Sequence, residues 1–168
     1  MRPKWRYNIR LAERKGVAVR AGGVADLPTY QRLVTETAQR NAFAAYGASY
    51  YRTAYELFAP SRQACLLVAE YQGEALAGVM VFIMGRTAWY LYGASGNTRR
   101  DLMPSYLLQW RAMQWARDRG CLTYDLWGIP DEVGKAPDRY SHAAIAAKND
   151  LWGVYRFKRG FGGELKRA

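Results

Sequence analysis

The chain has 168 residues, of which 50% are hydrophobic and 14% aromatic, so it suits one globular domain and is too apolar for a disordered segment. Two cysteines and a single histidine exclude a disulfide scaffold and a multi-cysteine or histidine-based metal centre, so we expect no metal and free thiols. The net charge of +11 indicates a polyanionic partner such as nucleic acid, although a basic surface that only aids solubility has the same composition.

The first expected element is a helix over residues 3–15, because a proline begins its first turn and Gly16 follows its end. Its apolar residues share one face, and the opposite face carries a stripe of Arg2, Arg6, Arg10 and Arg14. Such a stripe either binds an anion or is simply solvated. Under the first interpretation Arg6 and Arg10 contact the substrate. Residues 156–168 are also strongly basic. If both ends of the chain serve one ligand, they must face a shared groove.

Hydrophobic periodicity and turn residues predict the remaining elements. In chain order these are a strand at 17–21, helices at 26–43 and 46–58, strands at 64–71, 75–84 and 87–94, a helix at 104–119, a strand at 122–127, a loop over 128–149, a helix at 151–157 and a short strand at 164–167. The short turns between the three central strands make them antiparallel neighbours. This order predicts an α+β fold with a mixed sheet, of the GNAT acyltransferase type, in a single domain over residues 1–168.

The residues after the fourth of these strands bear on the cofactor. GNAT enzymes that use coenzyme A hold its pyrophosphate on a glycine-rich turn there, at the N-terminus of the next helix. This chain instead has Gly96 followed by Asn97, Thr98 and two arginines, whose side chains block the close approach that glycines allow. We therefore expect no coenzyme A site and no cofactor. A coenzyme-A-dependent N-acyltransferase with an atypical loop is kept as an alternative.

Several segments resemble the Fem aminoacyltransferases of peptidoglycan bridge formation: residues 4–17, 90–95, Pro104 with 107–110, 120–121, 124–128 and 153–163. The resemblance implies transfer of an amino acid from aminoacyl-tRNA to the stem-peptide amine of a nucleotide- or lipid-linked peptidoglycan precursor. Fem enzymes have two GNAT-like halves, and this chain is similar to the second. The resemblance thus implies a complementary first-half domain, a homodimer, or a fragment of a longer protein.

The resemblance also implies site residues. Lys158 matches the family's lysine at the acyl-transfer centre and would stabilise the oxyanion or the departing ribose oxygen. Substrate contacts are implied for the preceding Phe157, for Tyr50, and for Tyr90 or Tyr92 in the fourth strand. The alternative interpretation is a surface lysine in a basic tail, together with tyrosines that belong to the core.

Other reactive side chains receive smaller roles. Asp125 ends a strand, where we favour an anchor for the following loop over a general base, because an aminoacyl ester is already activated. His142 stands in a variable loop and receives no role, and Cys121 is expected to be a core thiol. Tyr46 stands where many family members carry an arginine, so one phosphate contact of the family is not assured here.

The sequence also favours a cytoplasmic protein without a transmembrane segment. No apolar run approaches the ~20 residues that a membrane span needs, and no apolar stretch follows the basic first residues as in a signal peptide. A third function is a non-catalytic domain that binds tRNA or another partner through its basic ends. Its binding would depend strongly on salt, without any transfer reaction.

Overall fold

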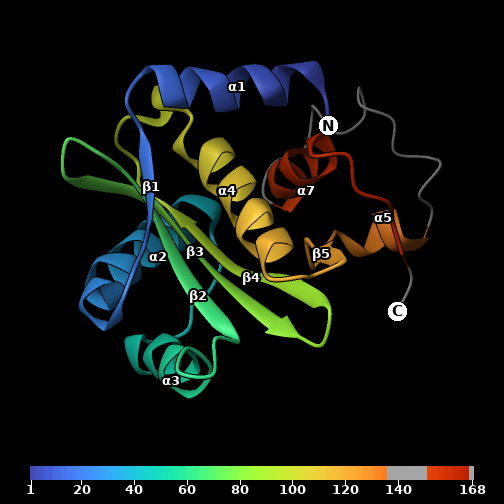
Figure 1. The fold of residues 1–168 in the computed structure, drawn as a ribbon. Helices are drawn as coiled ribbons and strands as arrows, with labels where there is room; N and C mark the ends of the chain where they lie inside the picture. Colours follow the sequence, from blue (N-terminus) through green and yellow to red (C-terminus); the bar gives the residue numbers. More distant parts are fainter. Residues whose placement is uncertain (136–150, 167–168) are drawn as a thin grey trace.

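The computed structural model describes residues 1–135 and 151–166, and within them a five-stranded mixed sheet (Figure 1). The strands follow one another in space as in sequence: β1 (Ala18–Ala21), β2 (Ala64–Tyr71), β3 (Glu74–Met84), β4 (Thr87–Ser95) and β5 (Thr123–Asp125). The first four strands pair antiparallel, and β5 pairs parallel to β4. This is the expected α+β architecture with a mixed sheet.

Helices cover both faces of this sheet (Figure 1). On one face lie α1 (Pro3–Arg14) and α4 (Pro104–Asp118), and on the other lie α2 (Leu27–Asn41) and α3 (Ala48–Phe58). The helix α7 (Leu151–Gly160) lies beside the N-terminus, and α5 (Asp131–Lys135) is a short helix after β5. Single 3₁₀ turns over Val24–Asp26 and Arg100–Leu102 precede α2 and α4. In the described part of the chain, no helix is long and apolar enough to cross a membrane.

The two faces of the sheet carry two separate cores because side chains alternate along each strand. On β2, Leu67 packs with α1 and α4, whereas Leu66 and Val68 pack with α2 and α3. Gly78 on β3 is required where α2 crosses the sheet, since a Cβ there would lie 2.7 Å from the ring of Tyr30. Burial on both faces explains why β2 and β3 are almost continuously apolar in sequence.

A β-bulge in β4 breaks this alternation. Tyr90 pairs with Val81 and Tyr92 pairs with Met80, so Leu91 has no partner across the ladder. Tyr90 therefore packs on the α1–α4 face and Tyr92 on the α2–α3 face, although two residues apart on a regular strand would share a face.

Most predicted elements are present, but the end of the chain differs. The strand expected at 122–127 is limited to Thr123–Asp125, and Trp127 then adopts a left-handed backbone with φ 58°. The strand expected at 164–167 is wrong for residues 164–166, which form no strand; Arg167 lies outside the described residues. The predicted loop over 128–149 contains α5, and His142 lies outside the described residues.

Candidate functional site

A cleft of about 840 Å³ opens where the N-terminus of α1, the C-terminus of α2, the end of β4, the start of α4 and the helix α7 meet. Its described lining contains no Asp or Glu, and it contains five basic residues: Arg2, Lys4, Arg40, Arg100 and Arg156. Such a cleft has a positive potential, which favours an anionic ligand.

Hydrogen bonds join the start of α1 to α7 and form one wall of this cleft; we call this contact between α1 and α7 the lock. The indole Nε1 of Trp5 donates to the Phe157 carbonyl at 2.9 Å, and the Arg2 amide donates to the Gly160 carbonyl at 2.9 Å. Gly160 permits this approach, because a Cβ there would lie 1.9 Å from the Trp5 ring. The lock brings Arg2 and Arg156 to the same cleft, as the shared-groove hypothesis requires.

Aromatic rings continue this wall. Trp5 packs edge-on against Tyr106 with ring centroids 5.5 Å apart, and Tyr106 packs in the same way against Phe157 at 5.2 Å. All three line the cleft, so the predicted Phe157 stands at the surface that a ligand would meet. A positive cleft lined by aromatic rings suits a nucleotide-containing ligand, because bases stack on aromatic side chains.

Lys158 is buried and does not line the cleft, so the alternative interpretation of a surface lysine in a basic tail is wrong. Its side chain is 8% exposed, and its Nζ donates to the Gly128 carbonyl at 2.6 Å. The same nitrogen lies 5.6 Å from the ring centroid of Tyr90, which itself lines the cleft. Burial lowers the pKa of Lys158 to about 8, and the charge of Asp125 acts in the opposite direction.

Tyr90 both contacts Lys158 and lines the cleft. Its ring covers Gly93, where a Cβ would lie 2.0 Å from the Tyr90 hydroxyl oxygen. Burial raises the pKa of Tyr90 to about 12, so the phenol is neutral at physiological pH. A neutral phenol at this wall can donate a hydrogen bond to a ligand.

Tyr50 and Tyr92 form a separate pair on the other face of the sheet. Their hydroxyl oxygens lie 2.7 Å apart, and Tyr46 stacks on Tyr50 with ring centroids 4.1 Å apart. Burial, and then the hydrogen bond with Tyr50, raise the pKa of Tyr92. Neither residue of the pair lines the cleft, so the structure does not bring them together with Lys158.

Arg6 and Arg10 are also outside the cleft lining. Both are exposed, and Arg6 donates to the Met1 carbonyl at 2.8 Å. A helix turns 100° per residue, so a spacing of four drifts by about 40° per step and only the first arginine of the stripe reaches the cleft. Arg2 and Arg156 therefore face a shared groove, whereas Arg6 and Arg10 do not line it and their substrate contacts stay a prediction.

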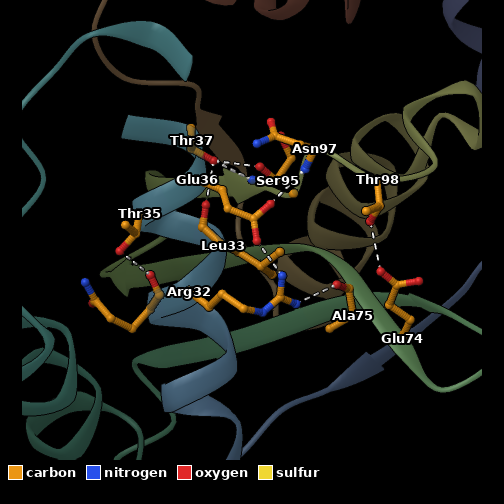
Figure 2. A network of polar contacts seen from close by, with 12 residues as sticks. Arg32, Leu33, Thr35, Glu36, Thr37, Glu74, Ala75, Ser95, Asn97 and Thr98 are labelled. Carbon is orange, nitrogen blue, oxygen red and sulfur yellow. Dashed lines mark hydrogen bonds and ion pairs between the residues drawn. The ribbon is translucent and has the colours of Figure 1, made fainter. Parts of the chain in front are cut away.

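The loop after β4 is tied to α2 by side chains (Figure 2). The Asn97 amide donates to Oε2 of Glu36 at 2.9 Å, and the Thr37 hydroxyl donates to the Ser95 carbonyl at 2.9 Å. The Gly96 amide donates to the Leu76 carbonyl at 2.8 Å. The Glu36 carboxylate thus accepts a hydrogen bond from the Asn97 amide. In a pyrophosphate-binding turn, such an amide would be free to donate to the ligand. This is a second physical reason, beside the lack of glycines, to expect no coenzyme A there.

Asp125 and Cys121 have the structural roles that the sequence favours. Asp125 anchors its loop, since its Oδ1 accepts the Trp127 amide at 2.7 Å. Cys121 packs partly buried against the α1–α4 core, and burial raises the pKa of its thiol. No cluster of His, Cys, Asp and Glu suited to a metal ion occurs within residues 1–135 and 151–166. Sequence reasoning missed Arg40 as a cleft residue.

Comparisons with known proteins agree with this architecture. The model of the FemAB family matches residues 1–73 and 67–168. A lipid II:glycine glycyltransferase of Staphylococcus epidermidis is 36% identical over 87 residues, which are 52% of this chain and 20% of that relative. The crystal structure of FemX superposes with a TM-score of 0.79 at 21% identity, over 95% of this chain and 53% of that chain.

A possible acetyltransferase from Clostridium difficile 630 shares the fold, with a TM-score of 0.60 at 11% identity over 90% of this chain and 95% of that chain. The chain thus has the size of one acetyltransferase domain and spans about half of the FemX chain. Because the family model extends over the whole sequence, the chain belongs to the FemAB family.

Proposed function

We propose that this chain is the second GNAT-like domain of an aminoacyltransferase that adds an amino acid to a lipid-linked peptidoglycan precursor, with aminoacyl-tRNA as the donor. The cleft carries the proposal: five basic side chains, an aromatic wall and no carboxylate in its described lining suit the 3′ end of an RNA. The naming of the staphylococcal relative as a lipid II:glycine glycyltransferase supports the acceptor.

The proposed reaction needs little from the protein beyond positioning and electrostatics. The acceptor amine attacks the ester carbonyl carbon, the bond from that carbon to the ribose oxygen breaks, and the amine loses a proton while the ribose oxygen gains one. Negative charge develops first on the carbonyl oxygen and then on the ribose oxygen. A positive charge nearby therefore stabilises the transition state more than the ground state.

Lys158 is the proposed source of that charge. With a pKa of about 8 its amine is mostly protonated at neutral pH, and its burial makes the charge act more strongly than it would in water. Tyr90, which contacts Lys158 and lines the cleft, is the proposed hydrogen-bond donor to the reacting oxygen. Phe157 is the proposed stacking surface for the terminal base.

The acceptor side is proposed to lie on the other face of the sheet. Tyr50 and Tyr92 would contact the precursor there, at the level of the bulge that separates Tyr92 from Tyr90. Because the chain spans about half of the FemX chain, we propose that a complementary GNAT-like domain or a second copy completes the acceptor site. Aminoacyl-tRNA places the reaction in the cytoplasm.

The test is a transfer assay with the chain together with its complementary domain. Labelled aminoacyl-tRNA and detergent-solubilised lipid II are the substrates, and a parallel reaction contains acetyl-CoA without tRNA. The proposal expects label on lipid II only when tRNA carries the amino acid. Acetylation of an amine by acetyl-CoA, with no transfer from tRNA, would support the N-acyltransferase instead. Salt-dependent tRNA binding without any transfer would support a non-catalytic domain.

A further inference from the structure

One end of the cleft contains two arginines from separate elements. Arg40 comes from the last turn of α2, and Arg100 from the 3₁₀ turn before α4. Arg40 is half-buried and is held by neutral oxygens: its guanidinium donates to the Ser95 hydroxyl at 2.8 Å, to the Ser95 carbonyl at 3.1 Å and to Oδ1 of Asn97. The guanidinium is thus fixed before any ligand arrives.

The two arginines at this end of the cleft have no carboxylate partner within residues 1–135 and 151–166. Burial, and then the charge of Arg100, lower the pKa of Arg40, and only Glu36 opposes them. Glu36 is itself engaged with Arg32 and the Asn97 amide. Two guanidinium groups that form no ion pair with the described residues therefore line the same end of the cleft, and an anion bound there would relieve their mutual repulsion.

We propose that Arg40 and Arg100 form a binding site for one phosphate group of a substrate. Arg100 can bind phosphate oxygens through paired N–H donors, whereas the terminal N–H groups of Arg40 are engaged with Ser95 and Asn97, so Arg40 contributes mainly its positive charge. Together the two charges match a phosphate or diphosphate better than a single carboxylate. The proposal rests on the proposed function and deepens it. Two substrates supply this chemistry: the sugar–phosphate backbone at the RNA 3′ end and the diphosphate of the lipid-linked precursor.

The chain offers a matched control in the neighbouring residue. Arg99 belongs to the same turn, but its guanidinium lies over the Tyr71 ring at 5.1 Å, its Nε is 3.8 Å from a Glu74 carboxylate oxygen, and it does not line the cleft. Arg99→Gln and Arg100→Gln remove the same charge from adjacent, exposed positions. A difference between them therefore reports the site and not the net charge.

The experiment measures the affinity of the whole chain and of both variants for three probes at several salt concentrations. The probes are an acceptor-stem RNA ending in CCA, geranyl diphosphate, and acetyl-CoA. We expect Arg100→Gln to weaken RNA or geranyl diphosphate about tenfold or more, and to lower the salt slope for RNA by about one. Arg99→Gln should remain within about twofold of the parent chain.

Each outcome separates the phosphate site from the proposed function. Loss of RNA binding assigns the phosphate to the donor, loss of geranyl diphosphate binding assigns it to the acceptor lipid, and loss of both indicates a shared site. If only acetyl-CoA binding depends on Arg100, the phosphate site stands and the proposed aminoacyl transfer fails. Equal effects of the two variants on every probe, or no effect of Arg100→Gln, would overturn the site.

Discussion

The ammonium nitrogen of Lys158 lies 5.6 Å from the ring centre of Tyr90, which joins a buried charge on α7 to a cleft-lining phenol on β4. The lysine is fixed by its bond to the Gly128 carbonyl, and the phenol by its packing over Gly93. This arrangement lets one charge influence the cleft without being solvated in it. Because burial lowers the pKa of Lys158 in the folded chain, the ionisation of this residue also affects the free energy of unfolding.

The first prediction concerns stability against pH. Burial lowers the pKa of Lys158 to about 8 in the folded chain, from an ordinary value of 10.5. Between these values the unfolded chain binds more protons than the folded chain, so stability should rise with pH through this window. The full effect is roughly 3 kcal/mol. Urea unfolding of the parent chain and of Lys158→Met from pH 7 to 10 measures it.

Methionine has a similar volume and no charge, so Lys158→Met should remove this pH dependence and should not destabilise the chain at pH 7. Equal pH dependence in both proteins would show that another group is responsible.

Asp125 provides a second prediction, on the pH profile of transfer. Asparagine keeps an oxygen for the Trp127 amide, so the loop should hold, but the charge that raises the pKa of Lys158 is lost. In Asp125→Asn the pKa of Lys158 should fall further. Because the proposed reaction needs protonated Lys158, the loss of activity with rising pH should begin at a lower pH than in the parent enzyme. A pH–rate profile from pH 6 to 9 tests this. A profile with a lower maximal rate but an unchanged pH dependence would assign Asp125 a structural role alone.

A third prediction concerns the lock between the two ends of the chain. In Gly160→Ala the new Cβ would meet the Trp5 ring, so the helix or the ring must shift. Overpacking of this kind costs about 1–3 kcal/mol, and each kcal/mol lowers Tm by roughly 2–4 °C in a chain of this size. Thermal unfolding followed by circular dichroism measures the shift.

Gly153→Ala is the matched control for the lock, since it lies in the same helix and nothing stands within 4 Å of its Cβ position. Alanine is the better helix former, so this variant should be as stable as the parent chain or slightly more stable. Equal Tm values for both variants would contradict the close packing of the Trp5 ring against Gly160.

Local patterns in the sequence predicted the elements well and the contacts between them less well. Alternation and turn residues located β2, β3 and β4, but nothing local reveals the bulge at Leu91 that sends Tyr90 and Tyr92 to opposite faces. The buried ammonium group of Lys158 donates to the carbonyl of Gly128, which is thirty residues away in the sequence. Long-range contacts of this kind leave no periodic signal.

The positions of the charged residues relative to the cleft were likewise not predictable from the local sequence. The spacing of the arginines in α1 predicted one stripe, yet helical drift brings only Arg2 to the cleft. Arg40 lies in the last turn of α2 among polar residues, as solvated arginines commonly do, and its place in the cleft depends on the contact between α2 and the end of β4. The strand expected at 164–167 rested on a few residues without a visible pairing partner.

The central claim is that the charge of Lys158 drives acyl transfer from tRNA. The direct test compares the parent chain, Lys158→Met and the control Lys15→Met, each with its complementary domain, in single-turnover transfer from aminoacyl-tRNA to lipid II. Lys15 is exposed at the end of α1 and does not line the cleft. The account predicts a loss of about 10²–10³-fold for Lys158→Met, as for removal of one transition-state donor, and parent activity for Lys15→Met. Parent activity in a folded Lys158→Met variant would contradict it.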